Sequence, residues 1–229
     1  MDGLFEARRN QTFVIHVLAT IPPMINEKEA YERVLGHYNA MTPFSRADFD
    51  LVIACSRYSL IRKNDFVFRQ GTIPSFGGYI FQGSLRQVIT DKSTREETVV
   101  GFNFEDSCFG DVRGIFYNEP SRTSLQAMED TLVGRLDKEH YLYLFDNCKS
   151  FARLMMVAQE IRNAELVQES VESKNIEAED RYLKMLTTYP HILLRASQRD
   201  IASYLGIKPQ SLSRIRKNIS QSPSIHCAA

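Results

Sequence analysis

One side of a predicted helix over residues 209–219 carries polar side chains that could read a DNA duplex. These side chains are Gln210, Ser213, Arg214 and Lys217. At about 100° per residue they lie opposite the apolar residues Leu212, Ile215 and Ile219. Arginine can donate two hydrogen bonds to guanine and glutamine can pair with adenine in the major groove, while serine and lysine reach base edges or phosphates. Because this face has no carboxylate, its chemistry suits a polyanion.

Two short helices joined by a tight turn are expected to hold this face in place. Ser197, with Asp200 three residues later, is typical of a capped helix start. Gly206 is expected to end that helix, and Pro209 fits the first turn of the next one. The apolar residues of the first half of the motif are Ile201, Ala202, Leu205 and Ile207. The pattern predicts a helix-turn-helix, in which the further candidate DNA contacts are Ser211, Lys208 and Arg199.

Charge is distributed unevenly along a chain whose formal net charge is zero. Residues 181–229 hold eight Lys or Arg and one acid, Asp200, so this segment is +7 and residues 1–180 are −7. A basic module joined to an acidic one is expected where only the C-terminal part meets double-stranded DNA. Two alternatives remain at this point, an ordinary three-helix unit with a solvated basic helix and a helical end that docks a protein partner.

Catalytic and metal-binding patterns are missing from the sequence. There is no Ser/His/Asp arrangement and no metal-ligand spacing, and the histidines are scattered at His16, His37, His140, His191 and His226. The cysteines form no C-x-x-C pair and are expected to be reduced and mostly buried; they are Cys55, Cys108, Cys148 and Cys227. We therefore expect no catalytic residue, no metal and no enzymatic activity.

The N-terminal segment 1–25 is expected to be an extension of unassigned role. Arg8 and Arg9 precede the apolar run 13–21 in the manner of a weak signal peptide, but the run is too short to span a bilayer. A cytoplasmic protein with no membrane partner is the better interpretation.

The middle of the chain changes from helical to β periodicity. Residues 26–58 are expected to form packing helices, and residues 60–136 hold about eight short β-rich runs separated by turn residues. This predicts an α+β protein in which a domain over 26–136 contains a jelly-roll-like β-roll.

Within the β region, the stretch 109–127 combines residues that could bind a small anion. A glycine, an acid, a short helix and an Arg-Thr-Ser run follow one another, with the candidate residues Gly110, Asp111, Arg122, Thr123 and Ser124. Glycine lets backbone N–H groups approach an anion, and arginine can bind a phosphate with two hydrogen bonds. The alternative is a structural turn in which Arg122 is tied to Asp111 or Glu119.

A single long helix is predicted over 137–172, because neither Pro nor Gly interrupts it. Its apolar seam is Leu144, Cys148, Phe151, Met155 and Ala158, whose steps of four and three suit a partner helix. A homodimer fits a motif that commonly reads two half-sites about 34 Å apart, and packing against the chain's own β-domain is the alternative. A hinge over 173–180, the DNA-binding domain over 181–219 and a tail over 220–229 would complete the chain.

Residues 26–219 resemble the Crp/Fnr family of bacterial transcription regulators. The resemblance lies in the β-roll, the FGD and SRTS segments, the long helix and the C-terminal motif. The segments EDRYLKMLTTYP and SQRDIASYLGIKPQSLSRIRK are similar to the branch common in Bacteroidota. The resemblance implies a homodimeric regulator, in which an effector bound to the β-roll controls DNA binding. RNA polymerase is the expected partner if the protein activates.

By the same resemblance, Pro209, Gln210 and Arg214 stand where the family reads bases, and Ser211 where it contacts a phosphate. The segment 110–124 matches the family's cyclic-nucleotide cassette with three departures. The acid is Asp111 instead of the usual Glu, Ser124 replaces an Ala, and the interval from acid to arginine is one residue longer. Since such a clamp needs placement within about 0.5 Å, we expect altered or lost cyclic-nucleotide specificity, and no cofactor is certain.

Overall fold

The computed structural model describes residues 27–221, apart from the side chains at positions 27, 173 and 174. The extension predicted over 1–25 and the chain from 222 onward lie outside the described residues. Two helices come first, α3 (Glu27–Met41) and α4 (Arg46–Cys55). They confirm the helical segment expected before the β region, and Ser45 caps α4 by accepting a hydrogen bond from the backbone N–H of Asp48 at 3.0 Å.

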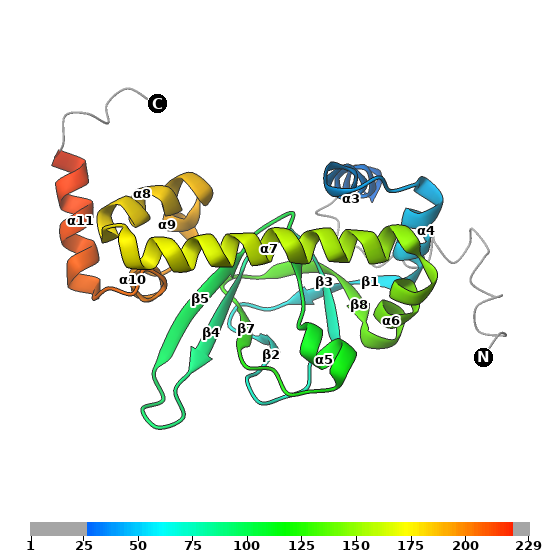
Figure 1. Ribbon diagram of the computed structural model, residues 1–229, viewed down its shortest axis with the longest axis horizontal. Helices are drawn as coiled ribbons and strands as arrows, with labels where there is room; N and C mark the ends of the chain where they lie inside the picture. The colour runs from blue at the N-terminus through cyan, green and yellow to red at the C-terminus, as the bar shows by residue number, and fades with distance from the viewer. Residues whose placement is uncertain (1–26, 222–229) are drawn as a thin grey trace.

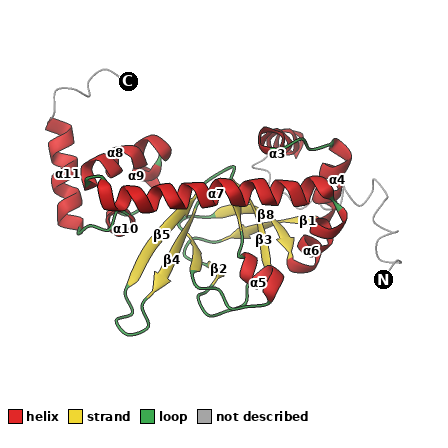
Figure 2. Cartoon of the chain, in the orientation of Figure 1, coloured by secondary structure: helices red, strands yellow, loops and turns green. Residues whose placement is uncertain are grey.

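Eight strands follow within the described chain and form a β-roll of two antiparallel four-stranded sheets (Figure 2). One sheet has the order β1 (Ser56–Ile61), β8 (Thr131–Asp137), β3 (Phe76–Gln82), β6 (Cys108–Phe109). The other has the order β2 (Phe66–Phe68), β7 (Ser124–Ala127), β4 (Leu85–Thr90), β5 (Glu97–Asn103). The short helix α5 (Val112–Tyr117) lies between β6 and β7 in the chain. The α+β class with a jelly-roll-like β-roll is thus confirmed.

Alternating side chains of the two sheets build the core of the β-roll. Ile80, Leu85 and Val133 are fully buried there, because successive residues of a strand point to opposite faces. At the turn between β3 and β4, Gly83 has φ +102°. A Cβ at this position would lie 2.5 Å from Oγ1 of Thr131, so only glycine fits.

The helix predicted as continuous over 137–172 is two helices. They are α6 (Lys138–Asn147) and α7 (Lys149–Asn175), and Cys148 between them is extended, with φ −121° and ψ 98°. Neither Pro nor Gly causes the break. The helix breaks because the turn buries Cys148 and Phe151 in a core shared with α3 and α4. The start of α7 is fixed where the Ser150 hydroxyl donates to the carboxylate of Asp48 at 2.6 Å.

The hinge predicted over 173–180 is shorter than expected, because α7 continues to Asn175 and α8 (Ala178–Thr188) begins three residues later. Polar contacts beside this stretch support the end of α7. Glu172 accepts a hydrogen bond from Gln168 at 2.6 Å and forms an ion pair with Lys184 of α8. Ile176 and Glu177 are the residues left between the two helices.

The last three helices are α9 (Ile192–Arg195), α10 (Gln198–Tyr204) and α11 (Pro209–Gln221). With α8 they lie at one end of α7, beside β4 and β5, while α3, α4 and α6 lie at its other end (Figure 1). Ile201 and Leu212 share one buried cluster with Val88 and Val99 of the β-roll. The C-terminal helices and the β-roll therefore have a common core. No helix in the described range 27–221 is long and apolar enough to span a membrane.

Candidate functional site

The turn between α10 and α11 is built by the residues expected for it. The Ser197 hydroxyl accepts a hydrogen bond from the Asp200 backbone N–H at 3.0 Å and donates one to the Asp200 carboxylate at 2.7 Å. Gly206 follows α10 with φ +66°, a left-handed conformation that a side chain would strain. The Ile207 N–H then donates to the carbonyl of Ala202 at 2.9 Å, and Pro209 opens α11. The Ser197 bonds cap the start of α10, and Gly206 with the Ile207 bond shapes the turn into α11.

The outer face of α11 carries the side chains predicted for it. Leu212 is fully buried on the inner side, whereas the exposed residues of the candidate set are Arg199, Lys208, Gln210, Ser213, Arg214 and Lys217. Ser211 is half-buried and its hydroxyl lies 3.5 Å from Nη2 of Arg214. None of the four basic residues of the set forms an ion pair within the described chain, so their positive charges are available to another molecule.

Ion pairs and hydrogen bonds hold α9 and α10 against the β-roll. Arg86 of β4 contacts the Asp200 carboxylate at 2.7 Å, and Arg195 contacts Glu105 at 2.7 and 2.8 Å. The Ser203 hydroxyl accepts a hydrogen bond from the backbone N–H of Val99 in β5 at 2.9 Å. These contacts use the inward side of the pair of helices and leave the outer face of α11 free.

The pKa of Glu105 is lowered at this contact. Burial opposes ionisation of the carboxyl group, but the Arg195 guanidinium and the Gly83 backbone N–H, both hydrogen-bonded to it, favour the charged form more strongly. The ion pair with Arg195 is therefore intact at neutral pH.

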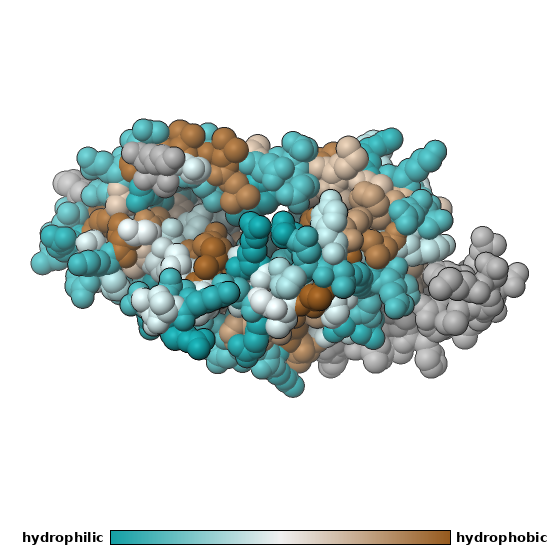
Figure 3. All heavy atoms as spheres, turned by 60° about the horizontal axis from the view of Figure 1, so that its bottom comes forward, coloured by the Kyte–Doolittle hydropathy of each residue, from teal (hydrophilic) through white to brown (hydrophobic). Residues whose placement is uncertain are grey.

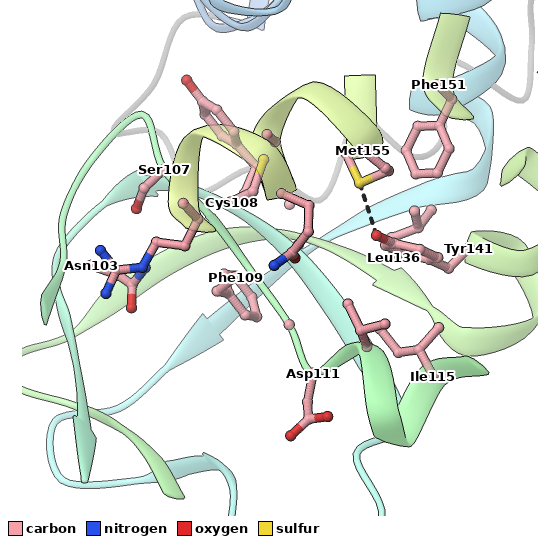
Figure 4. A pocket seen from close by; sticks show the side chains of 18 of the residues that line it. Asn103, Ser107, Cys108, Phe109, Asp111, Ile115, Leu136, Tyr141, Phe151 and Met155 are labelled. Carbon is pink, nitrogen blue, oxygen red and sulfur yellow. Dashed lines mark hydrogen bonds between the residues drawn. The ribbon is translucent and has the colours of Figure 1, made fainter. Parts of the chain in front are cut away.

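A cavity of about 1320 Å³ lies between the β-roll and α7 (Figure 4). Its lining is mostly apolar and aromatic, and the polar side chains among it include Asn103 and Asp111. Met155 of α7 reaches over it and its sulfur accepts a hydrogen bond from the Tyr141 hydroxyl at 2.8 Å. Gly110 and Asp111 line this cavity, as the predicted effector residues should.

The other predicted effector residues do not come together at the cavity. Arg122 is exposed, lies outside the cavity lining and has no ion pair in the described chain. The Thr123 hydroxyl accepts a hydrogen bond from the Gln87 amide at 2.9 Å, and the Ser124 hydroxyl accepts one from the Gln70 backbone N–H, also at 2.9 Å. Both hydroxyls act as acceptors in these bonds, and neither residue lines the cavity.

Asp111 has a structural role at the start of α5. Its carboxylate accepts a hydrogen bond from the Gly114 backbone N–H at 3.1 Å and caps the helix. The alternative pairing of Arg122 with Asp111 or Glu119 does not occur, because Glu119 pairs with Arg113. Among the five predicted effector residues, Gly110 and Asp111 line the cavity, and the other three lie outside its lining.

The seam predicted for a partner helix faces the chain's own core. Leu144, Cys148 and Phe151 are buried against α3 and α4, and Met155 and Ala158 line the cavity. The opposite side of α7 exposes apolar side chains instead, Val167 and Val171, at 65 and 50% of their full exposure. The alternative of packing within the chain therefore accounts for the predicted seam.

Some residues that shape these sites escaped the sequence reasoning. Arg86 and Arg195 hold the C-terminal helices to the β-roll, and Asn103 and Arg162 line the cavity. Each depends on contacts across 66 to 114 residues of sequence or on the course of α7 over the β-roll. No local spacing signals such contacts.

Residues 60–148 match the family model described as the cyclic nucleotide-binding domain. No curated protein sequence matches the chain significantly. Solved structures with the same fold include FixK2 from Bradyrhizobium japonicum, with 19% identity, a TM-score of 0.61 and coverage of 72% of this chain and 84% of that one. A putative Crp/Fnr-family transcriptional regulator from Eubacterium rectale has 14% identity, a TM-score of 0.61 and coverage of 82% and 88%.

A third similar structure is CLP from Xanthomonas campestris, described as a c-di-GMP responsive global regulator. It has 17% identity, a TM-score of 0.60 and coverage of 77% of this chain and 92% of that one. The β-roll is therefore of the cyclic nucleotide-binding domain type. Together with the C-terminal helices, it has the fold of Crp/Fnr regulators.

Proposed function

We propose that this protein is a DNA-binding transcription regulator without catalytic activity, acting in the cytoplasm. The observation that carries the proposal is the outer face of α11. Exposed Gln210, Arg214 and Lys217 stand there without ion pairs on a helix whose other side is anchored by buried Leu212. Such a face fits the major groove as the recognition helix of a helix-turn-helix. Arg199, Lys208, Ser211 and Ser213 are the supporting contacts to phosphates or base edges.

The regulator is a homodimer in this proposal, assembled through the outward side of α7. Val167 and Val171, four residues apart on this side, are exposed apolar side chains that a second copy of the helix would cover. Two copies of α11 would then read the half-sites of a near-palindromic sequence. The domains run from α3 to β8, from α6 to the end of α7, and from α8 to α11. RNA polymerase is the further partner if the regulator activates.

Contacts along α7 provide a route from the β-roll to the DNA-binding helices. Arg162 lines the cavity and forms an ion pair with Glu169 at 3.4 Å. The same oxygen of Glu169 accepts a hydrogen bond from the Tyr204 hydroxyl of α10, also at 3.4 Å. An effector that moves Arg162 would change the support of α10, and a coupling of about 1 to 3 kcal/mol makes a useful switch.

Binding to duplex DNA tests the proposal. A selected duplex is titrated by fluorescence anisotropy at several salt concentrations, with two chains expected per site and a steep loss of affinity as salt rises. Replacing Arg214→Ala should weaken specific binding by about 1 to 3 kcal/mol and relax one base preference. Arg122→Ala, an exposed arginine of the β-roll, is the matched control and should leave the affinity unchanged.

The alternative function is a ligand sensor whose C-terminal helices dock a protein. Duplex affinity that is weak, indifferent to salt and equal in the wild-type and Arg214→Ala proteins would favour this alternative. The DNA-binding proposal would then be wrong.

A further inference from the structure

We infer that the cavity beneath α7 binds an uncharged, largely apolar small molecule with one hydrogen-bonding group. This inference rests on the proposed function, because it names the effector class of that regulator. The volume of the cavity, about 1320 Å³, is ample for such a molecule, since ligand pockets commonly measure about 300 to 1,000 Å³. Phe109, Ile115 and Met155 are among the apolar side chains that surround it (Figure 4).

No unpaired arginine or lysine of the described chain lines the cavity. Its two arginines are Arg57, which pairs with Asp137, and Arg162, which pairs with Glu165 and Glu169. The acids that line it outnumber these two; they are Asp106, Asp111, Glu160 and Glu165. A bound phosphate or carboxylate would lose its water without gaining a free cation, which is strongly unfavourable.

Asp111 further disfavours an anion at the N-terminal end of α5. Its carboxylate occupies the Gly114 backbone N–H, so a negative charge already lies where an anionic ligand would approach. Thr123 and Ser124 lie outside the cavity lining, so their hydroxyls are not placed to donate to a phosphate there. The lining therefore selects against charge on the ligand.

Asn103 supplies the polar part of the recognition. Its side chain lines the cavity and has no hydrogen bond within the described residues. An amide offers both donors and an acceptor, which suits a hydroxyl, carbonyl or amide on the ligand. An apolar body with one such group satisfies both the apolar walls and this residue.

The binding class can be measured with probes on the full chain. Nile red, which is uncharged and fluoresces in apolar surroundings, reports occupancy of the cavity. Indole-3-acetamide and indole-3-acetate, which share a ring system but differ in charge, then compete with the dye, as does cyclic AMP. We expect the amide to displace Nile red at a concentration at least about tenfold lower than the acetate, a difference of one decade in affinity, and cyclic AMP to displace none.

Tryptophan substitutions that fill the cavity test whether the dye binds there. Met155→Trp fills the space beneath α7, and Val112→Trp fills it from the half-exposed start of α5, where folding is less at risk. Each should abolish dye binding while the circular dichroism spectrum stays as in the wild type. Arg122→Ala, which removes an exposed arginine outside the cavity lining, is the control and should leave dye binding unchanged.

Several results would overturn the inference. The dye fails to bind the wild-type protein, or its binding persists in both folded Trp variants. In the competition, the acetate or cyclic AMP displaces the dye as well as the amide does, or neither indole displaces it. Duplex binding measured on the same preparations separates the two proposals. Loss of one activity with retention of the other identifies which proposal has failed.

Discussion

The outer face of α11 and the segment 109–124 both carry side chains suited to binding, yet the structure uses their polar groups differently. On α11, Gln210, Arg214 and Lys217 remain exposed above a buried leucine, and neither basic residue forms an ion pair within the described residues. In the segment 109–124, Asp111 caps a helix and Thr123 is hydrogen-bonded to a neighbouring strand. A polar residue near a glycine often builds the turn itself, and only its remaining hydrogen-bonding capacity can serve a ligand.

The two sides of α11 give the largest expected contrast. Leu212→Ala should lower the free energy of unfolding by about 2 to 5 kcal/mol, because it leaves a cavity in the core shared with the β-roll. Arg214→Ala, two residues later on the exposed side, should change it by no more than about 0.5 kcal/mol. Urea denaturation followed by circular dichroism measures both. Equal effects would contradict the assignment of an inner and an outer side.

Asp111 tests the other half of the comparison. Asp111→Ala should cost about 0.5 to 2 kcal/mol of stability without any ligand present, since it removes the cap of α5. Asp111→Asn, which can still accept the Gly114 hydrogen bond, is the matched control and should retain most of that stability. Thermal unfolding of the three proteins decides the matter. A stable Asp111→Ala variant would mean that the carboxylate is free for a ligand after all.

The smallest expected effect concerns the ion pair of Glu105 with Arg195, which joins the β-roll to the C-terminal helices. The pKa of Glu105 is lowered by Arg195 and the Gly83 backbone, so the ion pair stabilises the folded chain above pH 4.5, the ordinary value of this carboxyl group. That stabilisation is lost as the pH falls through the lowered pKa. Thermal unfolding between pH 3 and 7 should therefore show a weaker acid dependence in Glu105→Gln than in the wild type. An identical pH profile would exclude this carboxylate from the contact.

Local patterns predicted the local structure well. The strands between Ser56 and Asp137, the Ser197 cap and the turn at Gly206 all follow from residues close in sequence. The break of the long helix at Cys148 could not be predicted this way, because burial against α3 and α4 decides it. For the same reason the four-and-three spacing from Leu144 to Ala158 could not decide between a partner helix and packing within the chain.

The candidate site was predictable in part. The exposed side of α11 followed from helical periodicity, since Leu212 fixes which side turns inward. The partners of Arg86 and Arg195 lie in other elements, and a cavity is a property of packed elements rather than of any segment. Asn103 and Arg162 could therefore be recognised only in the folded chain.

The core shared by β4, β5 and the last helices also bears on how this protein is made. Val88 and Val99 are covered by residues that follow them by about a hundred positions, such as Ile201 and Leu212. During synthesis the β-roll emerges from the ribosome first, and this apolar edge stays uncovered until α10 and α11 have been translated. The nascent chain is thus most prone to aggregation just before its C-terminal helices appear, and exchanging those helices with a relative's would require exchanging the sheet surface beneath them.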